Sequence, residues 1–329
     1  MKVVAALLLS IAVVLPAGCA SESGDAAWTD DEVSFDADGL TIHGTYRHRG
    51  QDPGPAALLI SESGNTDRNG DNQVAGPIGN MRQLAELLSE RDVASLRYDK
   101  VGTGRTGLGR YATDPAAVVS GVYTQGAGAA VRFLATQPGT DADRISVYGL
   151  GEGTIHAMAL AGDDAPDAPR IHALGLLQPL PGRYLDIITA RVAADGAPET
   201  VETWRSAVDQ LRTTATVPDD LPDGLTAIVN PANVAAVVEA DKIDPLALAA
   251  AIPAGTRVLL TCSDADSQAS CDAMRPLADA LDHTDLMLVE LTGVNHVLRD
   301  DPSDSIANYA NQEPLSPQLV TALDEFVAS

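Results

Sequence analysis

The segment Val147–Thr154 (VYGLGEGT) restricts the possible folds of this chain more than any other. An apolar, partly β-branched run leads into it, and a small-residue apolar run, Ile155–Ala161, follows it. This order predicts a strand, a sharp turn and a helix. Gly149 and Gly153 flank one central residue at the spacing of the strand-to-helix turn that presents a nucleophile. That central residue is Gly151, so the turn is predicted with its nucleophile position vacant.

The rest of the chain alternates strands with helices, which predicts an α/β fold with a mostly parallel sheet covered on both faces. Alternating apolar and polar residues around Asp38-Gly39 predict an antiparallel hairpin with strands near 32–35 and 40–48. Apolar runs predict further strands near 55–61, 93–98, 145–148, 171–177, 257–262 and 286–291. Helical spacing of apolar residues predicts helices near 80–91, 118–137, 155–161, 270–281 and 317–327. Residues 181–251 break this alternation with a purely helical pattern. We therefore predict a core of residues 32–180 and 252–329 with an inserted helical cap, 181–251.

Two polar loops follow strands late in the chain. Asp264 and Asp266 lie directly after the strand near 257–262, and His296 lies in the loop after the next strand. A nucleophile, an acid and a histidine in this chain order form a catalytic triad in one large group of hydrolases. A histidine in such a loop can reach the turn at Gly151, and a carboxylate bonded to it would fix its tautomer.

Five stretches together carry a family resemblance: SGNTDRNG (63–70), LRYDKVGTG (96–104), VYGLGEGT (147–154), SDADSQ (263–268) and GVNH (293–296). With these stretches the chain resembles the α/β-hydrolase superfamily, in its bacterial dienelactone-hydrolase and serine-aminopeptidase-like branch. The resemblance extends from about residue 40 to the C-terminus. It implies an α/β-hydrolase fold with an eight-stranded type of sheet, a cap over the substrate, and hydrolysis of esters, amides or related acyl compounds.

The resemblance also implies site residues. His296 would be the base and Asp266 its orienting acid, with Asp264 as the alternative. The oxyanion hole would be formed by the backbone N–H of Glu152 and by one from Ser63 or Gly64.

Three positions depart from the family pattern: Gly151 replaces the serine, Thr154 replaces a further glycine, and Glu62 replaces a glycine that often precedes the oxyanion serine. Without a hydroxyl at 151 no acyl-enzyme can form there. The expected function is therefore a non-catalytic, ligand-binding hydrolase relative, a pseudoenzyme that binds a small acyl or lipid-like molecule. Two alternatives stay open: a working hydrolase in which His296 activates water or a serine of the oxyanion loop (Ser61 or Ser63), and a structural envelope protein.

Composition excludes some partners. The formal net charge is −25, so nucleic acid should be repelled and is not expected as a partner. Aromatic residues make up only 4% of the chain, which leaves the core to aliphatic side chains. No cofactor is expected. No metal site is expected either, because His43, His48, His156 and His172 lack the spacing of paired ligands.

The N-terminus has the pattern of an export signal. Lys2 precedes an apolar run that is too short for a comfortable membrane span and ends in Pro16-Ala17-Gly18-Cys19. This end resembles a bacterial lipobox, although Pro16 departs from it. We predict a signal peptide (1–18), lipid on Cys19, a flexible tether (19–31) and anchoring at the outer face of the cell membrane; secretion is the alternative.

Cys262 and Cys271 are the two other cysteines of the chain. They flank a short loop, and an exported protein meets an oxidising compartment, so a disulfide is expected between them. Two buried free thiols are the alternative.

Overall fold

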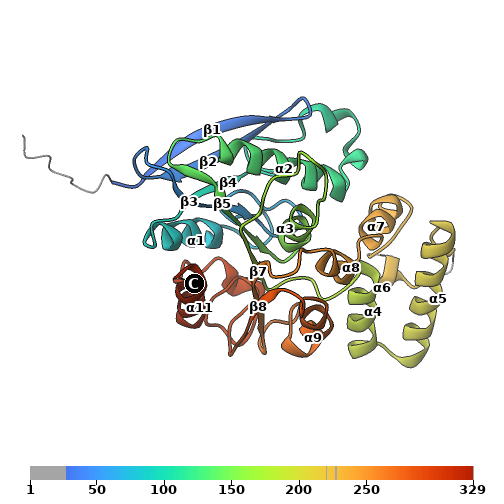
Figure 1. The fold of residues 1–329 in the computed structure, drawn as a ribbon. Coiled ribbons are helices and arrows are strands. Elements are labelled where there is room, and N and C mark those ends of the chain that lie inside the picture. The colour runs from blue at the N-terminus through green and yellow to red at the C-terminus, as the bar shows by residue number, and fades with distance from the viewer. Residues whose placement is uncertain (1–26, 220, 227, 329) are drawn as a thin grey trace, which may run out of the picture.

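The computed structural model describes residues 27–219, 221–226 and 228–328. Its centre is an eight-stranded sheet in the order β1-β2-β4-β3-β5-β6-β7-β8 (Figure 1). The strands are β1 (Thr29–Ala37), β2 (Leu40–His48), β3 (Gly54–Ile60), β4 (Ala94–Tyr98), β5 (Thr140–Leu150), β6 (Ala173–Leu177), β7 (Arg257–Ser263) and β8 (Asp285–Leu291). β2 pairs antiparallel with β1 and β4, and the strands from β4 to β8 pair in parallel.

Helices cover both faces of the sheet, as the apolar strands require. In β3, Leu58 and Ile60 pack on the face covered by α2 (Ser120–Ala135), α3 (Gly153–Ala161) and α9 (Cys271–Ala280). The neighbouring side chain of Leu59 points to the opposite face, covered by α1 (Asn80–Ser89) and α11 (Pro317–Ala328). Successive strand residues alternate between faces, so a central strand buried on both sides must be apolar throughout.

The cap has a small hydrophobic core of its own. It is built mainly from α4 (Tyr184–Asp195), α5 (Pro198–Thr214), α6 (Asp223–Thr226) and α7 (Val234–Asp241), and it lies to one side of the sheet in Figure 1. Trp204 is fully buried in it and donates its indole N–H to Thr189 at 3.0 Å. Buried Asp241 accepts hydrogen bonds from Arg183 and Arg212 at 2.9 and 2.8 Å, which ties α7 to α4 and α5.

Helix α8 (Pro245–Ala250) lies within the range predicted for the cap but packs differently from α4 to α7. Its Ala249 is buried in the core cluster beneath α3 and α9 rather than in the cap cluster. The cap cluster therefore ends before residue 245, and the boundary predicted at 251 lies just after a helix that packs in the core.

The first strand begins earlier than predicted. The sequence assigned residues 19–31 to a tether, whereas β1 starts at Thr29 opposite His48. Two cross-strand ion pairs fix these residues: Asp31 to His48 at 3.0 Å and Asp30 to Arg47 at 3.4 Å. Asp30 and Asp31 therefore belong to strand β1, because they contact basic residues on β2, although the composition of this segment is typical of a linker.

The predicted signal peptide, Cys19 and most of the tether lie outside the described residues. Within the described residues, no helix combines the length and apolar character that a bilayer crossing requires. Shorter elements complete the chain: 3-10 helices at Gly109–Thr113 and Pro115–Ala117, and α10 (Ile306–Tyr309).

Candidate active site

The loops after β3, β5, β7 and β8 meet at the carboxyl edge of the parallel sheet, the edge where open α/β sheets bind ligands. They carry Glu62, Gly151, Asp266 and His296 respectively. The chain brings these residues together although they are far apart in sequence.

The turn between β5 and α3 has the predicted shape. Gly151 has φ +53°, in the left-handed region. Its two flanking glycines are required by close backbone approach: a Cβ on Gly149 would lie 2.4 Å from the Gly153 carbonyl carbon, and a Cβ on Gly153 would lie 2.4 Å from the Ile60 oxygen. Thr154 is buried, and its hydroxyl donates to the Gly151 carbonyl at 2.6 Å, so it stabilises the first turn of α3.

The acid and the histidine form a buried pair. His296 Nδ1 lies 2.8 Å from Asp266 Oδ2, and the other carboxylate oxygen accepts the N–H groups of Gln268 and Ala269 at 2.7 and 3.1 Å. Asp264, the alternative acid, instead accepts the Gly293 N–H at 2.7 Å. The geometry therefore selects Asp266 as the partner of His296.

A second carboxylate holds the backbone of the histidine loop. Asp304 accepts the His296 N–H at 2.9 Å, the Ser267 hydroxyl at 2.9 Å and the Tyr309 hydroxyl at 2.6 Å. It thus joins the acid loop to the histidine loop. Asp304 is not predictable as a site residue from the sequence, because it lies beyond the family motifs in an irregular segment.

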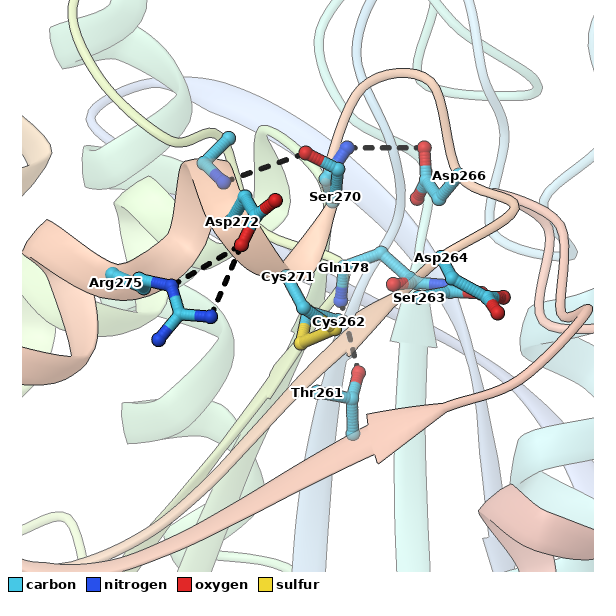
Figure 2. Close-up of a disulfide and its surroundings, with 12 residues drawn as sticks. Gln178, Thr261, Cys262, Ser263, Asp264, Asp266, Ser270, Cys271, Asp272 and Arg275 are labelled. Carbon is cyan, nitrogen blue, oxygen red and sulfur yellow. Dashed lines mark hydrogen bonds and ion pairs between the residues drawn. A yellow bond between two sulfur atoms is a disulfide. The ribbon is translucent and has the colours of Figure 1, made fainter.

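Cys262 and Cys271 form a disulfide, with their Cα atoms 4.9 Å apart. Figure 2 shows it at the base of the loop that carries Asp264 and Asp266. The bond joins β7 to the first residue of α9 and closes this loop at both ends. A short closed loop has fewer alternative conformations, so the disulfide helps to fix Asp266 against His296.

The position predicted to be vacant is filled by the side chain of Glu62. Its Oε2 lies 3.0 Å from His296 Nε2, where the hydroxyl of a catalytic serine would be expected. Its Oε1 accepts the backbone N–H of Ser63 at 2.6 Å and that of Glu152 at 3.3 Å. These two N–H groups are the predicted oxyanion donors; the Gly64 N–H makes no bond to this oxygen. One carboxylate therefore occupies both the predicted nucleophile position and the predicted oxyanion hole.

A side chain at position 151 would require the Glu62 carboxylate to move from its present position. A Cβ built on Gly151 would lie 1.4 Å from Glu62 Oε2, far inside any allowed contact. Relative to the family pattern, position 62 lacks a glycine and position 151 has one in place of serine. From the sequence alone, these are two separate departures. Two opposite size changes in facing loops are the signal that would have identified Glu62.

Neither of the two alternative serines is hydrogen-bonded to His296. Ser61 donates its hydroxyl to the Thr66 carbonyl at 3.1 Å, and Ser63 is exposed. Nε2 of His296 faces Glu62 rather than either hydroxyl.

The loop that carries Glu62 is stabilised by hydrogen bonds and ion pairs to neighbouring loops. The buried ammonium of Lys100 donates to the Glu62 backbone carbonyl, and burial lowers the pKa of Lys100. Further along, the Arg68 guanidinium lies 2.8 Å from Asp99 and 2.9 Å from Glu32. Asp67 accepts the N–H groups of Asn69 and Asp71 at 2.8 and 3.1 Å, so Asp67 and Arg68 both stabilise the loop.

The pKa values of His296 and Glu62 are shifted so that both side chains are charged near neutral pH. Burial by itself would lower the pKa of His296, but the hydrogen bonds and charges of Asp266 and Glu62 raise it to about 10. Burial would raise the pKa of Glu62, but the hydrogen bond and charge of His296, with the Ser63 N–H, lower it to about 2. An imidazolium between two carboxylates is therefore the stable state near neutral pH.

Two cavities open beside Glu62. The larger, of about 320 Å³, lies between the core and the cap. Its lining is mainly aliphatic and includes Ile155, Leu180, Ile187, Ile188, Ile243 and Pro245. The carboxyl groups of Glu62 and Glu152 line it on the core side. The smaller, of about 150 Å³, lies on the His296 side and includes Ile78, Val297 and Tyr309. Glu62, Ser63 and Gln268 line both cavities.

The histidines outside the site are not gathered around a shared ligand. Over the described ranges, no three His, Cys, Asp or Glu side chains form a cluster that could hold a metal ion. His156 is buried and bonded to Thr124 at 2.9 Å, and burial lowers its pKa to about 3. His48 pairs with Asp31 on the outer hairpin.

Comparison with solved structures supports the fold assignment. The Pyrococcus furiosus esterase Pf2001 superposes with a TM-score of 0.56 at 14% identity, over 92% of this chain and 91% of that one. Est1E from Butyrivibrio proteoclasticus gives 0.54 at 16% identity, over 91% and 99%. A dienelactone hydrolase-like promiscuous phosphotriesterase, P91 from metagenomic libraries, gives 0.53 at 15% identity, over 92% and 97%. The sequence matches no protein-family model and no curated protein. The predicted α/β-hydrolase fold is confirmed.

Proposed function

We propose that this chain is an exported, lipid-anchored protein of α/β-hydrolase fold that binds a small, neutral, largely apolar ligand between core and cap and does not hydrolyse esters through a serine. The observation that carries the proposal is the position of the Glu62 carboxylate, bonded to His296 and to both oxyanion N–H groups. A substrate carbonyl oxygen would have to displace it from the oxyanion hole. The similarity in fold to esterases supports a pocket for acyl-like compounds.

The charges of the larger cavity favour a neutral ligand. Glu62 and Glu152 line it on the core side and Arg191 on the cap side, and an anion that reached the core side would be repelled by an ionised Glu62 at short range. Burial and the charge of Glu62 raise the pKa of Glu152 against the opposing charge of Lys100. The aliphatic lining supplies the favourable contacts for an apolar chain.

Titration calorimetry with 1-octanol tests the binding. We expect Ile187→Trp, which fills the larger cavity, to weaken binding by about tenfold or more, equivalent to about 1.4 kcal/mol. Leu288→Trp is the matched control, since Leu288 is 43% exposed on β8 and lies outside both cavities. Equal loss of affinity in the two variants, or no binding by the native protein, would contradict the proposed pocket.

The lipid anchor is tested separately by Cys19→Ser. Two or three acyl chains on Cys19 would hold the protein at a membrane surface, so the variant should move from the membrane fraction to the soluble fraction. The same partition in both proteins would exclude lipidation of Cys19 as the anchor.

A further inference from the structure

Glu62 is an ionised carboxylate that lies between two open cavities and beside a charged histidine. We propose that it is a nucleophile toward saturated carbon, and that the site opens small, neutral epoxides through a glutamyl ester. The inference rests on the proposed function in one respect, the binding of a neutral apolar ligand between core and cap. It adds a reaction that needs no serine.

The carboxylate has the two contacts that such a reaction requires. Oε1 is held by the N–H groups of Ser63 and Glu152, and Oε2 faces His296 Nε2 at 3.0 Å. Its side chain keeps 20% of its surface exposed, whereas those of His296 and Asp266 keep 3% and 0%. Glu62 is thus the most exposed member of this trio, while His296 also borders the smaller cavity. Carboxylates are established covalent nucleophiles in enzymes.

Saturated carbon is favoured over acyl carbon because the oxyanion hole is already occupied. Attack on an acyl group develops negative charge on the substrate oxygen, which then needs the N–H donors that Oε1 holds. Displacement at saturated carbon needs only room for the substrate and a proton for the leaving oxygen. The two adjoining cavities, of about 320 and 150 Å³, give that room. An epoxide fits because its leaving oxygen is strained, neutral before attack and in need of one proton.

In the first step, Oε2 of Glu62 forms a bond to one epoxide carbon. The ring C–O bond breaks, its electron pair stays on the ring oxygen, and that oxygen takes the Nε2 proton of His296. The products of this step are a neutral glutamyl ester that carries a hydroxyl group and a neutral imidazole. Asp266 keeps the imidazole oriented through Nδ1.

In the second step, neutral His296 takes a proton from water while the water oxygen attacks the ester carbon of Glu62. Oε1, the carbonyl oxygen of the ester, becomes the oxyanion, and it is already in contact with the Ser63 and Glu152 N–H groups. The tetrahedral intermediate then breaks the bond between the Glu62 carboxyl carbon and Oε2. Oε2 departs with the product and takes the proton of the Glu62 carboxylic acid that forms. A 1,2-diol leaves, and Glu62 and His296 return as carboxylate and imidazolium.

The change of charge explains how one histidine serves both steps. The carboxylates of Glu62 and Asp266 raise the pKa of His296, so it begins as an acid. Esterification makes Glu62 neutral and removes one of these two charges. The pKa of His296 then falls, and the residue becomes a base for the second step.

The test follows oxygen from water into Glu62. The native protein is incubated with 1,2-epoxyoctane in oxygen-18 water, and the peptide that contains Glu62 is analysed by mass spectrometry together with the diol. We expect diol formation and one oxygen-18 exchange in this peptide. Glu62→Gln should lower the rate by on the order of 10³-fold or more, whereas Glu290→Gln, at an exposed carboxylate of β8, should behave as native.

Each remaining outcome contradicts the inference in a distinct way. Diol formation without oxygen-18 in the Glu62 peptide would mean that water attacks the epoxide directly, and the nucleophile would be wrong. An epoxide that displaces 1-octanol but stays unconverted would exclude the reaction and leave the binding proposal intact. An epoxide that neither binds nor reacts, in a protein that also fails to bind 1-octanol, would contradict both.

Discussion

The double variant Glu62→Gly, Gly151→Ser is expected to react with a fluorophosphonate probe and to hydrolyse 4-nitrophenyl butyrate at a rate on the order of 10³-fold above the native protein. Removal of the Glu62 side chain frees the Ser63 and Glu152 N–H groups, and it leaves His296 Nε2 without its present partner. A serine at 151 then meets a histidine already oriented by Asp266. Probe labelling and ester turnover measure the gain.

The single variants are the controls. Gly151→Ser alone should react much more slowly than the double variant, because the Glu62 carboxylate must first move away from the new Cβ and release its bonds to His296 and the two N–H groups. Glu62→Gly alone should free the donors but supply no nucleophile. A Ser at φ +53° costs about 1–3 kcal/mol in backbone strain, so the melting temperature of each variant is measured beside activity. Full activity of Gly151→Ser alone would show that Glu62 does not close the site.

The second prediction concerns pH. The pKa of His296 is raised from 6.5 to about 10, so its contribution to stability should be complete below pH 6.5 and be lost as pH rises through about 10. The pKa of Glu62 is lowered from 4.5 to about 2, so its contribution should be complete above pH 4.5 and be lost as pH falls through about 2. Melting temperatures across pH should therefore show the network at full strength between pH 4.5 and 6.5.

Glu62→Gln separates this network from other titrating groups. The variant removes one of the two carboxylates beside His296, so we expect the histidine pKa to fall and the alkaline loss of stability to shrink. Nitrogen-15 NMR of the imidazole rings measures the pKa in both proteins. His156 serves as an internal control, because burial lowers its pKa to about 3 and it should stay neutral over the whole range above pH 5. A His296 pKa near 6.5 in both proteins would contradict the ion network.

Much of the fold was predictable because local pattern and tertiary burial agree. The continuous apolar run of β3 is a strand buried on both faces, and the glycines on either side of position 151 are required by contacts under 3 Å to neighbouring backbone. Predictions failed where composition and contacts disagree. Asp30 and Asp31 resemble a linker but pair with Arg47 and His48, and α8 has a cap-like sequence but packs in the core.

Part of the candidate site was predictable from the order of the parallel strands. His296 and Asp266 follow neighbouring parallel strands, whose carboxyl ends must meet, so their proximity follows from topology. The choice between Asp264 and Asp266 did not follow, because both lie in one loop. It depends on which carboxylate the Gly293 N–H engages, and that is a contact between loops.

The sequence by itself determined a strand–turn–helix with no side chain at its centre, an oxyanion loop, an acid and a histidine in a fixed order along an α/β chain. These features are local, or follow from the order of strands in a parallel sheet. Only the tertiary structure decided what lies at the centre of the site. Glu62 reaches His296 and Gly151 because the loops after β3, β5 and β8 converge there, and no local pattern encodes where a flexible glutamate side chain ends. The turn that lacks a nucleophile thus contains a carboxylate supplied by another loop.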